Sequence, residues 1–164
     1  MKVIDIRVYD RSMQRQKSLC ISPLGNRLYA IAKETLIEIE TDEGTFHKCF
    51  MPGFVTNFRS GGLFVDRFVD QIGSTLEQQV LWLNHDADYT PCAWRNGEHP
   101  VSKDLADYIL LAGLEFLNVG YIKRESIYWS VRLFGRKAYE EDDELTEKNS
   151  TLFRAAWNTK ASRR

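Results

Sequence analysis

Residues 76–89 carry the pattern that most restricts the fold, because this segment has helical periodicity and is apolar on two opposite sides. At 100° per residue its apolar side chains divide into two rows, Leu76, Val80, Leu83 and Ala87 on one side and Leu81, Trp82 and Tyr89 on the other. A helix that is apolar on both sides is normally the buried centre of a domain. The segment is therefore predicted to lie between two layers of structure.

The same helix carries polar residues that suit a functional site. His85 falls on the side of Trp82 and Tyr89, and Asp86 follows it directly. Both are expected inside the protein or at the floor of a cleft. Upstream, Ser74 and Glu77 have the spacing of a capping box, which predicts where the helix begins.

Composition excludes several classes of protein. The chain has 164 residues, enough for one domain with a core, and its 43% hydrophobic and 27% charged content is typical of a globular protein. A net charge of -1 argues against a nucleic-acid partner or an acidic membrane, since either would need a basic surface. With no apolar run of about 18 residues and no signal-peptide core, the sequence predicts no transmembrane segment and a cytosolic location.

The cysteines indicate neither a disulfide framework nor a zinc knuckle. Cys20, Cys49 and Cys92 are odd in number and widely spaced, with no C-x-x-C pair. Buried free thiols are the expected state.

The first fifty residues read as strands. Alternation predicts strands at 3–8, 19–21, 28–32, 35–41 and 45–50, with a bend near Lys33 and Glu34 and a hairpin at residues 42–44. Residues 23–26 have turn chemistry, and 52–62 read as a loop with inward aromatics followed by a short segment at 63–72. The strands form a small antiparallel meander, which must pack on something else to bury a face.

Two further helices follow the central one. Ser102 caps a helix that extends through Asn118, and Asp107 falls among its apolar residues. A covered carboxylate needs a partner, because burying it alone would cost several kcal/mol or force it to hold a proton. A third helix, from Tyr121 to Tyr139, offers Arg132 on a polar stripe with Glu125 and Arg136.

The predicted fold is α+β: an N-terminal antiparallel β-meander packed on a three-helix core, with a C-terminal extension. The domain spans residues 1–139 and the charged extension 140–164. Within the extension, Leu152, Phe153 and Trp157 have the spacing of a short amphipathic helix, which suits an interface with another protein.

Four motifs occur here in a recognisable order. They are Gly53-Phe54-Val55-Thr56-Asn57-Phe58-Arg59-Ser60, His85-Asp86-Ala87-Asp88-Tyr89, Ala106-Asp107-Tyr108-Ile109 and Tyr128-Trp129-Ser130-Val131-Arg132-Leu133-Phe134-Gly135. Over roughly residues 45–139 the chain thus resembles a family of small phage and prophage proteins of unknown function, with a G-F-x-T-D-F-A-S loop and H-D-x-x-Y, A-D-x-x and Y-x-x-V-R-L-F-G helices. It departs from that pattern at Asn57, where the family has an aspartate.

The resemblance implies a phage source, located in the virion or the host cytoplasm. A phage-encoded virion component or accessory protein is then expected to act through protein-protein interaction with other phage or host proteins, as part of a larger assembly. The chemistry of any cofactor is not specified by the sequence.

A second likeness supports an alternative, a metal-assisted hydrolase of lipid or cell-envelope substrate that serves entry or lysis. The histidine-aspartate helix facing a buried aspartate is similar to the arrangement in secreted phospholipases. That likeness implies His85 as the base, Asp107 and Tyr89 as the residues that orient it, and Asp86 as a metal ligand. The phospholipases also have disulfides and a glycine-rich calcium loop upstream, and here only Gly61-Gly62 could stand for that loop.

Two other interpretations of the same residues stay open. In the first, His85, Tyr89, Asp107 and Arg132 form a satisfied buried polar network that fixes helix packing. In the second, His85 and Asp86 bind zinc or another metal together with His99. His47, on a strand, is expected to be an ordinary residue with no role in a site.

Overall fold

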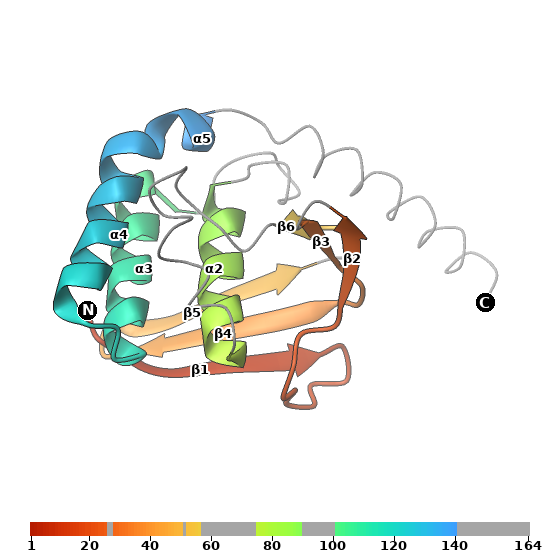
Figure 1. The fold of residues 1–164 in the computed structure, drawn as a ribbon. Coiled ribbons are helices and arrows are strands. Elements are labelled where there is room, and N and C mark those ends of the chain that lie inside the picture. Colours follow the sequence, from red (N-terminus) through yellow and green to blue (C-terminus); the bar gives the residue numbers. More distant parts are fainter. Residues whose placement is uncertain (26–27, 51, 57–74, 90–100, 141–164) are drawn as a thin grey trace.

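The computed structural model describes residues 1–25, 28–50, 52–56, 75–89 and 101–140, and it confirms the α+β fold with strands first and helices after (Figure 1). Its strands are β1 (Val3–Asp10), β2 (Ile21–Gly25), β3 (Leu28–Ile31), β4 (Thr35–Thr41), β5 (Gly44–Phe50) and β6 (Val55–Thr56). Its helices are α2 (Leu76–Asp88), α3 (Lys103–Phe116), α4 (Tyr121–Phe134) and α5 (Arg136–Glu140).

The strands form two three-stranded sheets rather than one meander in chain order. The first sheet has the order β1-β4-β5 and the second β2-β3-β6. β1 pairs antiparallel with β4, so that Ile6 faces Ile39 and Val8 faces Ile37. All four of these side chains are buried, so this pairing joins the apolar rows of two strands that are distant in the sequence.

The first hairpins agree closely with those predicted from the sequence, except at β2. The bend near Lys33 and the turn at residues 42–44 are confirmed, since β4 begins at Thr35 and pairs with β5 across that turn. The strand expected at residues 19–21 instead begins at Ile21 and continues through Pro23, where a turn was predicted. Proline is tolerated there because β2 lies at the edge of its sheet.

The loop predicted from residue 52 contains a short strand. Residues Val55–Thr56 form β6 and pair with β3, Ala30 facing Val55 and Tyr29 facing Thr56. The inward position expected for the aromatic residues is confirmed at Phe54, which is buried. Residues 57–74, which include the predicted segment 63–72, lie outside the described residues.

α2 has the central place that its two apolar sides predict. Val80, Leu83 and Ala87 pack in a core cluster with the first sheet. Leu81 and Trp82 belong to a second cluster, with Leu110, Leu114, Ile127 and Val131 of α3 and α4. In Figure 1, α2 stands over the sheet with α3 and α4 beside it. Each fully buried apolar side chain of this size stabilises the fold by roughly 1.5–3 kcal/mol.

The helix ends differ from the predicted ones by small amounts. The cap of α2 is Thr75, which forms a capping box with Gln78, one residue later than the predicted Ser74 and Glu77. Thr75 takes this role because its own backbone is extended and the helix starts at the next residue. Ser102 caps α3 as predicted, accepting a hydrogen bond from the Leu105 amide at 3.3 Å.

The third predicted helix is broken in two. α4 ends at Phe134 and α5 begins at Arg136, with Gly135 between them. The Gly135 backbone lies against the Tyr89 hydroxyl and the Val131 carbonyl, so a side chain would not fit there. Glycine at this point also lowers helix propensity, which favours the interruption.

The cysteine prediction was wrong for the two cysteines that can be placed. Cys20 and Cys49 form no disulfide, as expected, but both are exposed rather than buried. Cys49 occupies an outward position of β5, whose buried neighbours are Lys48 and Phe50. Cys92 lies outside the described residues. No described helix is long and apolar enough to cross a bilayer.

Candidate functional site

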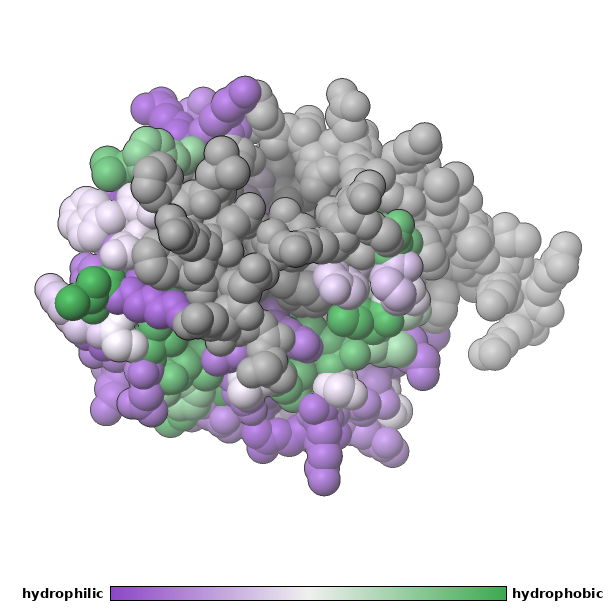
Figure 2. Space-filling view, in the orientation of Figure 1, coloured by the Kyte–Doolittle hydropathy of each residue, from purple (hydrophilic) through white to green (hydrophobic). Residues whose placement is uncertain are grey.

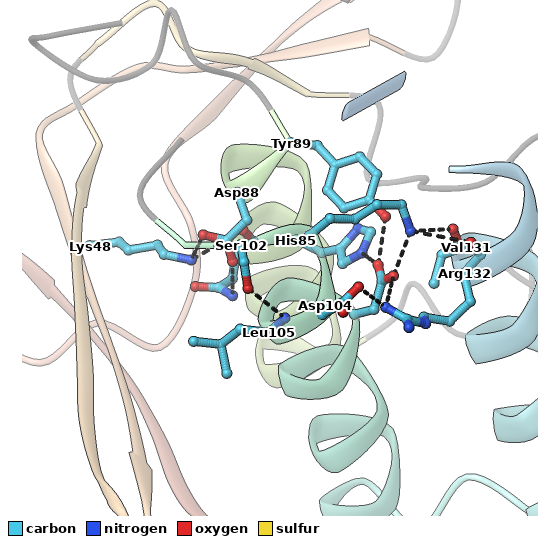
Figure 3. A network of polar contacts seen from close by, with 12 residues as sticks. Lys48, His85, Asp88, Tyr89, Ser102, Asp104, Leu105, Val131 and Arg132 are labelled. Atoms are coloured by element: carbon cyan, nitrogen blue, oxygen red, sulfur yellow. Dashed lines mark hydrogen bonds and ion pairs between the residues drawn. The ribbon is translucent and has the colours of Figure 1, made fainter. Parts of the chain in front are cut away.

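The predicted meeting of an imidazole and a carboxylate between two helices occurs. His85 and Tyr89 lie one turn apart at the end of α2 and both reach Asp107 on α3 (Figure 3). The distance from His85 Nε2 to Asp107 Oδ1 is 3.2 Å, and the Tyr89 hydroxyl donates to the same oxygen at 2.5 Å. His85 and Asp107 are both 0% exposed. The two predicted orienting residues are therefore in contact with each other and with the histidine.

Two cations complete the surroundings of Asp107. Lys103, four residues earlier on α3, donates from Nζ to Asp107 Oδ2 at 2.7 Å. Arg132 of α4 brings Nη1 to 3.6 Å from the same oxygen and also bonds Asp104. His85, Tyr89, Lys103, Asp107 and Arg132 are called the Asp107 cluster below.

The cluster determines the protonation of its two acidic members. Burial alone would raise the pKa of Asp107, but hydrogen bonds from His85, Lys103 and Tyr89 together outweigh it and lower that pKa. Burial, reinforced by the hydrogen bond to Asp107, raises the pKa of the Tyr89 phenol. Asp107 is therefore a carboxylate near neutral pH and Tyr89 a neutral hydrogen-bond donor.

These charges define the tautomer of His85. An ionised carboxylate only accepts hydrogen bonds, so His85 Nε2 carries the proton that lies toward Asp107. A neutral ring then keeps a lone pair on Nδ1, and this buried atom has no hydrogen-bond partner within the described part of the chain. Such a nitrogen can accept a proton from water or a hydroxyl that reaches it.

Lys103 and Arg132 extend the cluster to α4. Lys103 Nζ donates to the Val131 carbonyl at 3.0 Å and to the Arg132 carbonyl at 3.4 Å. These carbonyls belong to the last turn of α4, and the Val131 carbonyl also accepts a hydrogen bond from the Gly135 amide at 2.9 Å. The cluster thus joins α2, α3 and α4 at one point. The place of Arg132 was predicted, whereas Lys103 was missed although its i, i+4 spacing to Asp107 is visible in the sequence.

Asp86 points away from the Asp107 cluster. Its side chain is half-buried and accepts a hydrogen bond from the Thr56 hydroxyl of β6. Across the described ranges, no three His, Cys, Asp or Glu side chains gather as metal ligands would. The structure therefore brings His85, Tyr89 and Asp107 together but does not place Asp86 with them, and the metal role of Asp86 stays a prediction.

A second buried polar group on α2 was not predicted. Lys48 of β5 forms an ion pair with Asp88, and Asn84 Nδ2 donates to the other Asp88 oxygen at 3.2 Å. Burial lowers the pKa of Lys48, although Asp88 opposes that shift. Figure 3 shows Lys48 and Asp88 on the strand side of α2, and His85 and Tyr89 toward the other helices.

Several predicted site residues cannot be placed. Leu152, Phe153, Trp157, His99, Asn57 and Gly61-Gly62 all lie outside the described residues. His47 lies on a strand as predicted, in β5, and it is exposed, with Nδ1 3.2 Å from Glu38 Oε1.

Comparison of the chain with protein-family models, with curated proteins and with solved structures gave no match.

Proposed function

We propose that this chain is a phage-encoded virion component or accessory protein that acts by binding other phage or host proteins, in the virion or the host cytoplasm. The observation that carries the proposal is the outer side of α4. There Ile122, Trp129 and Leu133 are 82%, 53% and 66% exposed. The phage origin is supported by the order of the four sequence motifs.

These three residues lie along one side of a single helix rather than scattered over the surface. Their spacing of seven and four places them on one side of α4, opposite the buried Ile127 and Val131. Figure 2 shows green and pale atoms along the left edge of the molecule, where α4 lies. Clustered exposed apolar side chains mark interaction surfaces, and tryptophan often contributes most to binding energy.

The proposal predicts that α4 is required for partner binding. The Trp129→Ser/Leu133→Ser double variant should co-purify phage-encoded partners from infected cells at least tenfold less than the unchanged protein, because the apolar contact is lost. Quantitative mass spectrometry of tagged protein measures this. The matched control is Ile4→Ser, which removes a 52% exposed apolar residue of β1 and should leave recovery unchanged. Equal recovery with the double variant would contradict the proposal.

A hydrolase acting on lipid or cell-envelope substrate is the second candidate. It is favoured by one observation: His85 Nε2 is held by Asp107, while Nδ1 has no hydrogen-bond partner among the described residues. In that function His85 accepts the proton of an attacking water, Asp107 and Tyr89 orient the ring, and Asp86 is the predicted metal ligand. The cluster's polar contacts serve equally well as the packing network of an interaction protein.

The hydrolase candidate is tested with purified protein, phospholipid vesicles and isolated cell walls. Divalent cations are added, and released fatty acid or wall fragments are measured. Activity should fall about 10²–10⁴-fold in His85→Asn and stay unchanged in His47→Asn, which alters an exposed histidine. No hydrolysis by the unchanged protein, or equal activity in both variants, removes this candidate.

A further inference from the structure

We propose that the outer side of α4 binds a second copy of this chain, with the two α4 helices antiparallel across a twofold axis. This inference rests on the proposed function and identifies a partner for it. The contact surface is the α4 stripe, defined as Ile122, Ser126, Trp129 and Leu133. Spacings of four, three and four between these residues are those of the contacting positions of a helix pair.

The α4 stripe is complementary to itself when the second helix runs in the opposite direction. Centring the axis between residues 127 and 128 sets Ile122 against the second copy's Leu133, and Ser126 against its Trp129. A small residue then faces the largest one, and two branched aliphatic residues face each other. The Ser126 hydroxyl already donates to the Ile122 carbonyl at 2.7 Å, so covering it leaves no unsatisfied donor.

Charges beside the stripe select the same orientation. Glu125 and Arg132 lie seven residues apart on one flank of α4. Antiparallel pairing brings Glu125 of each copy to Arg132 of the other, twice in the dimer. Parallel pairing in register would instead set Glu125 beside Ser130 of the second copy, where it meets no cation, so only the antiparallel arrangement forms these ion pairs.

The state of these two side chains in one chain supports the pairing. Glu125 is half-buried, and none of the described residues forms an ion pair with it. Arg132 contacts Asp104 and Asp107 through Nη1, and its side chain is still 30% exposed. Because the anion and the cation lie on the same helix, a second copy related by a twofold axis pairs both of them, and no other protein is needed.

The contact is a single pair of short helices, so a weak dimer is expected. Interfaces of this small size are at the low end for specific association, and a dissociation constant in the micromolar range, roughly, is expected. Sedimentation or light scattering from about 1 to 100 µM should therefore show a monomer-dimer equilibrium. A monomer across that range would overturn the inference.

A charge exchange tests the orientation. Glu125→Arg and Arg132→Glu should each weaken self-association at least tenfold, because each places like charges together. An equimolar mixture of the two variants should dimerise again, since both contacts become opposite in sign. Lys17→Glu, which reverses an exposed charge between β1 and β2, is the control and should dimerise like the unchanged protein.

A second variant keeps the test decisive if Arg132→Glu disturbs the Asp107 cluster. Ser126→Trp leaves every charge in place but sets two tryptophans against each other, so it should also weaken the dimer. Unchanged dimerisation in both Ser126→Trp and Glu125→Arg would overturn the inference. If the chain is monomeric while Trp129→Ser/Leu133→Ser still loses phage partners, the second copy is the wrong occupant and the proposed function stands. If the dimer forms but those partners are retained, the proposed function fails instead.

Discussion

Gly113 controls, as a single residue, how closely α2 approaches α3. A Cβ at this position would overlap both terminal methyl groups of Leu81. Alanine is normally favoured over glycine inside a helix by about 1 kcal/mol, yet here the clash should reverse the sign. Gly113→Ala is expected to lower the free energy of unfolding by about 1–3 kcal/mol, measured by urea denaturation.

The cause of that loss can be isolated with a compensating change. Leu81→Ala alone should cost about 2–5 kcal/mol, because it leaves a cavity between the two helices. In the Leu81→Ala/Gly113→Ala double variant, the added methyl group enters that cavity. The double variant should therefore lose less free energy of unfolding than the two single variants lose together. Strict additivity would show that the Leu81 side chain is not what Gly113 accommodates.

Some site residues could be predicted from the sequence because helical spacing places them. His85 and Tyr89 are one turn apart on a helix with two apolar sides, and Asp107 interrupts an apolar row, so each implies a buried polar partner. Lys48 was missed, although it shares the inward phase of β5 with Phe50. A lysine in that phase usually extends its charged end to solvent, and only the position of Asp88 shows that it does not.

At the scale of elements, local signals predicted where helices lie better than how strands pair. Ser102 and the apolar periodicity located α3, and alternation located β4 and β5. β1 pairs with β4 and not with β2, the next strand in the sequence. β2 and β3, which lie between them in the sequence, belong to a second sheet. Which strands pair depends on which apolar rows meet in the folded core, and no local sequence pattern predicts that.

The two apolar sides of α4 show a similar limit. Ile127 and Val131 are buried, whereas Ile122, Trp129 and Leu133 are exposed, yet both sets have helical spacing. Sequence periodicity shows that each side is apolar but not which one the same chain covers. Packing against α2 and α3 covers the side with Ile127 and Val131, and it leaves exposed the side that we propose for binding.

Taken as a whole, the molecule holds α2 by polar contacts on both of its sides. The Asp107 cluster ties its last turn to α3 and α4, and the Lys48 ion pair with Asp88 ties the same turn to β5. Apolar packing alone would allow α2 to slide or rotate between the two apolar core clusters. The buried charges fix one position, since any other leaves a charge without its partner.

Asp107 should therefore contribute to global stability in a pH-dependent way. Asp107→Asn is expected to lower the free energy of unfolding by about 3 kcal/mol at neutral pH, because it leaves the Lys103 ammonium beside a neutral amide. Asp104→Asn is the matched control, since this exposed carboxylate also bonds Arg132 and should cost less than about 1 kcal/mol.

The pKa of Asp107 is lowered in the folded state, below the ordinary value of 3.8. Its stabilising effect is then fully present above that ordinary value and disappears as the pH falls through the lower, folded one. Urea denaturation at pH 7 and at about pH 2.5 should show a smaller difference between the two conditions in Asp107→Asn than in the unchanged protein. Suppose instead that the free energy of unfolding falls equally in both proteins between the two pH values. The cluster then does not hold Asp107 as a carboxylate, and α2 is positioned by its apolar packing.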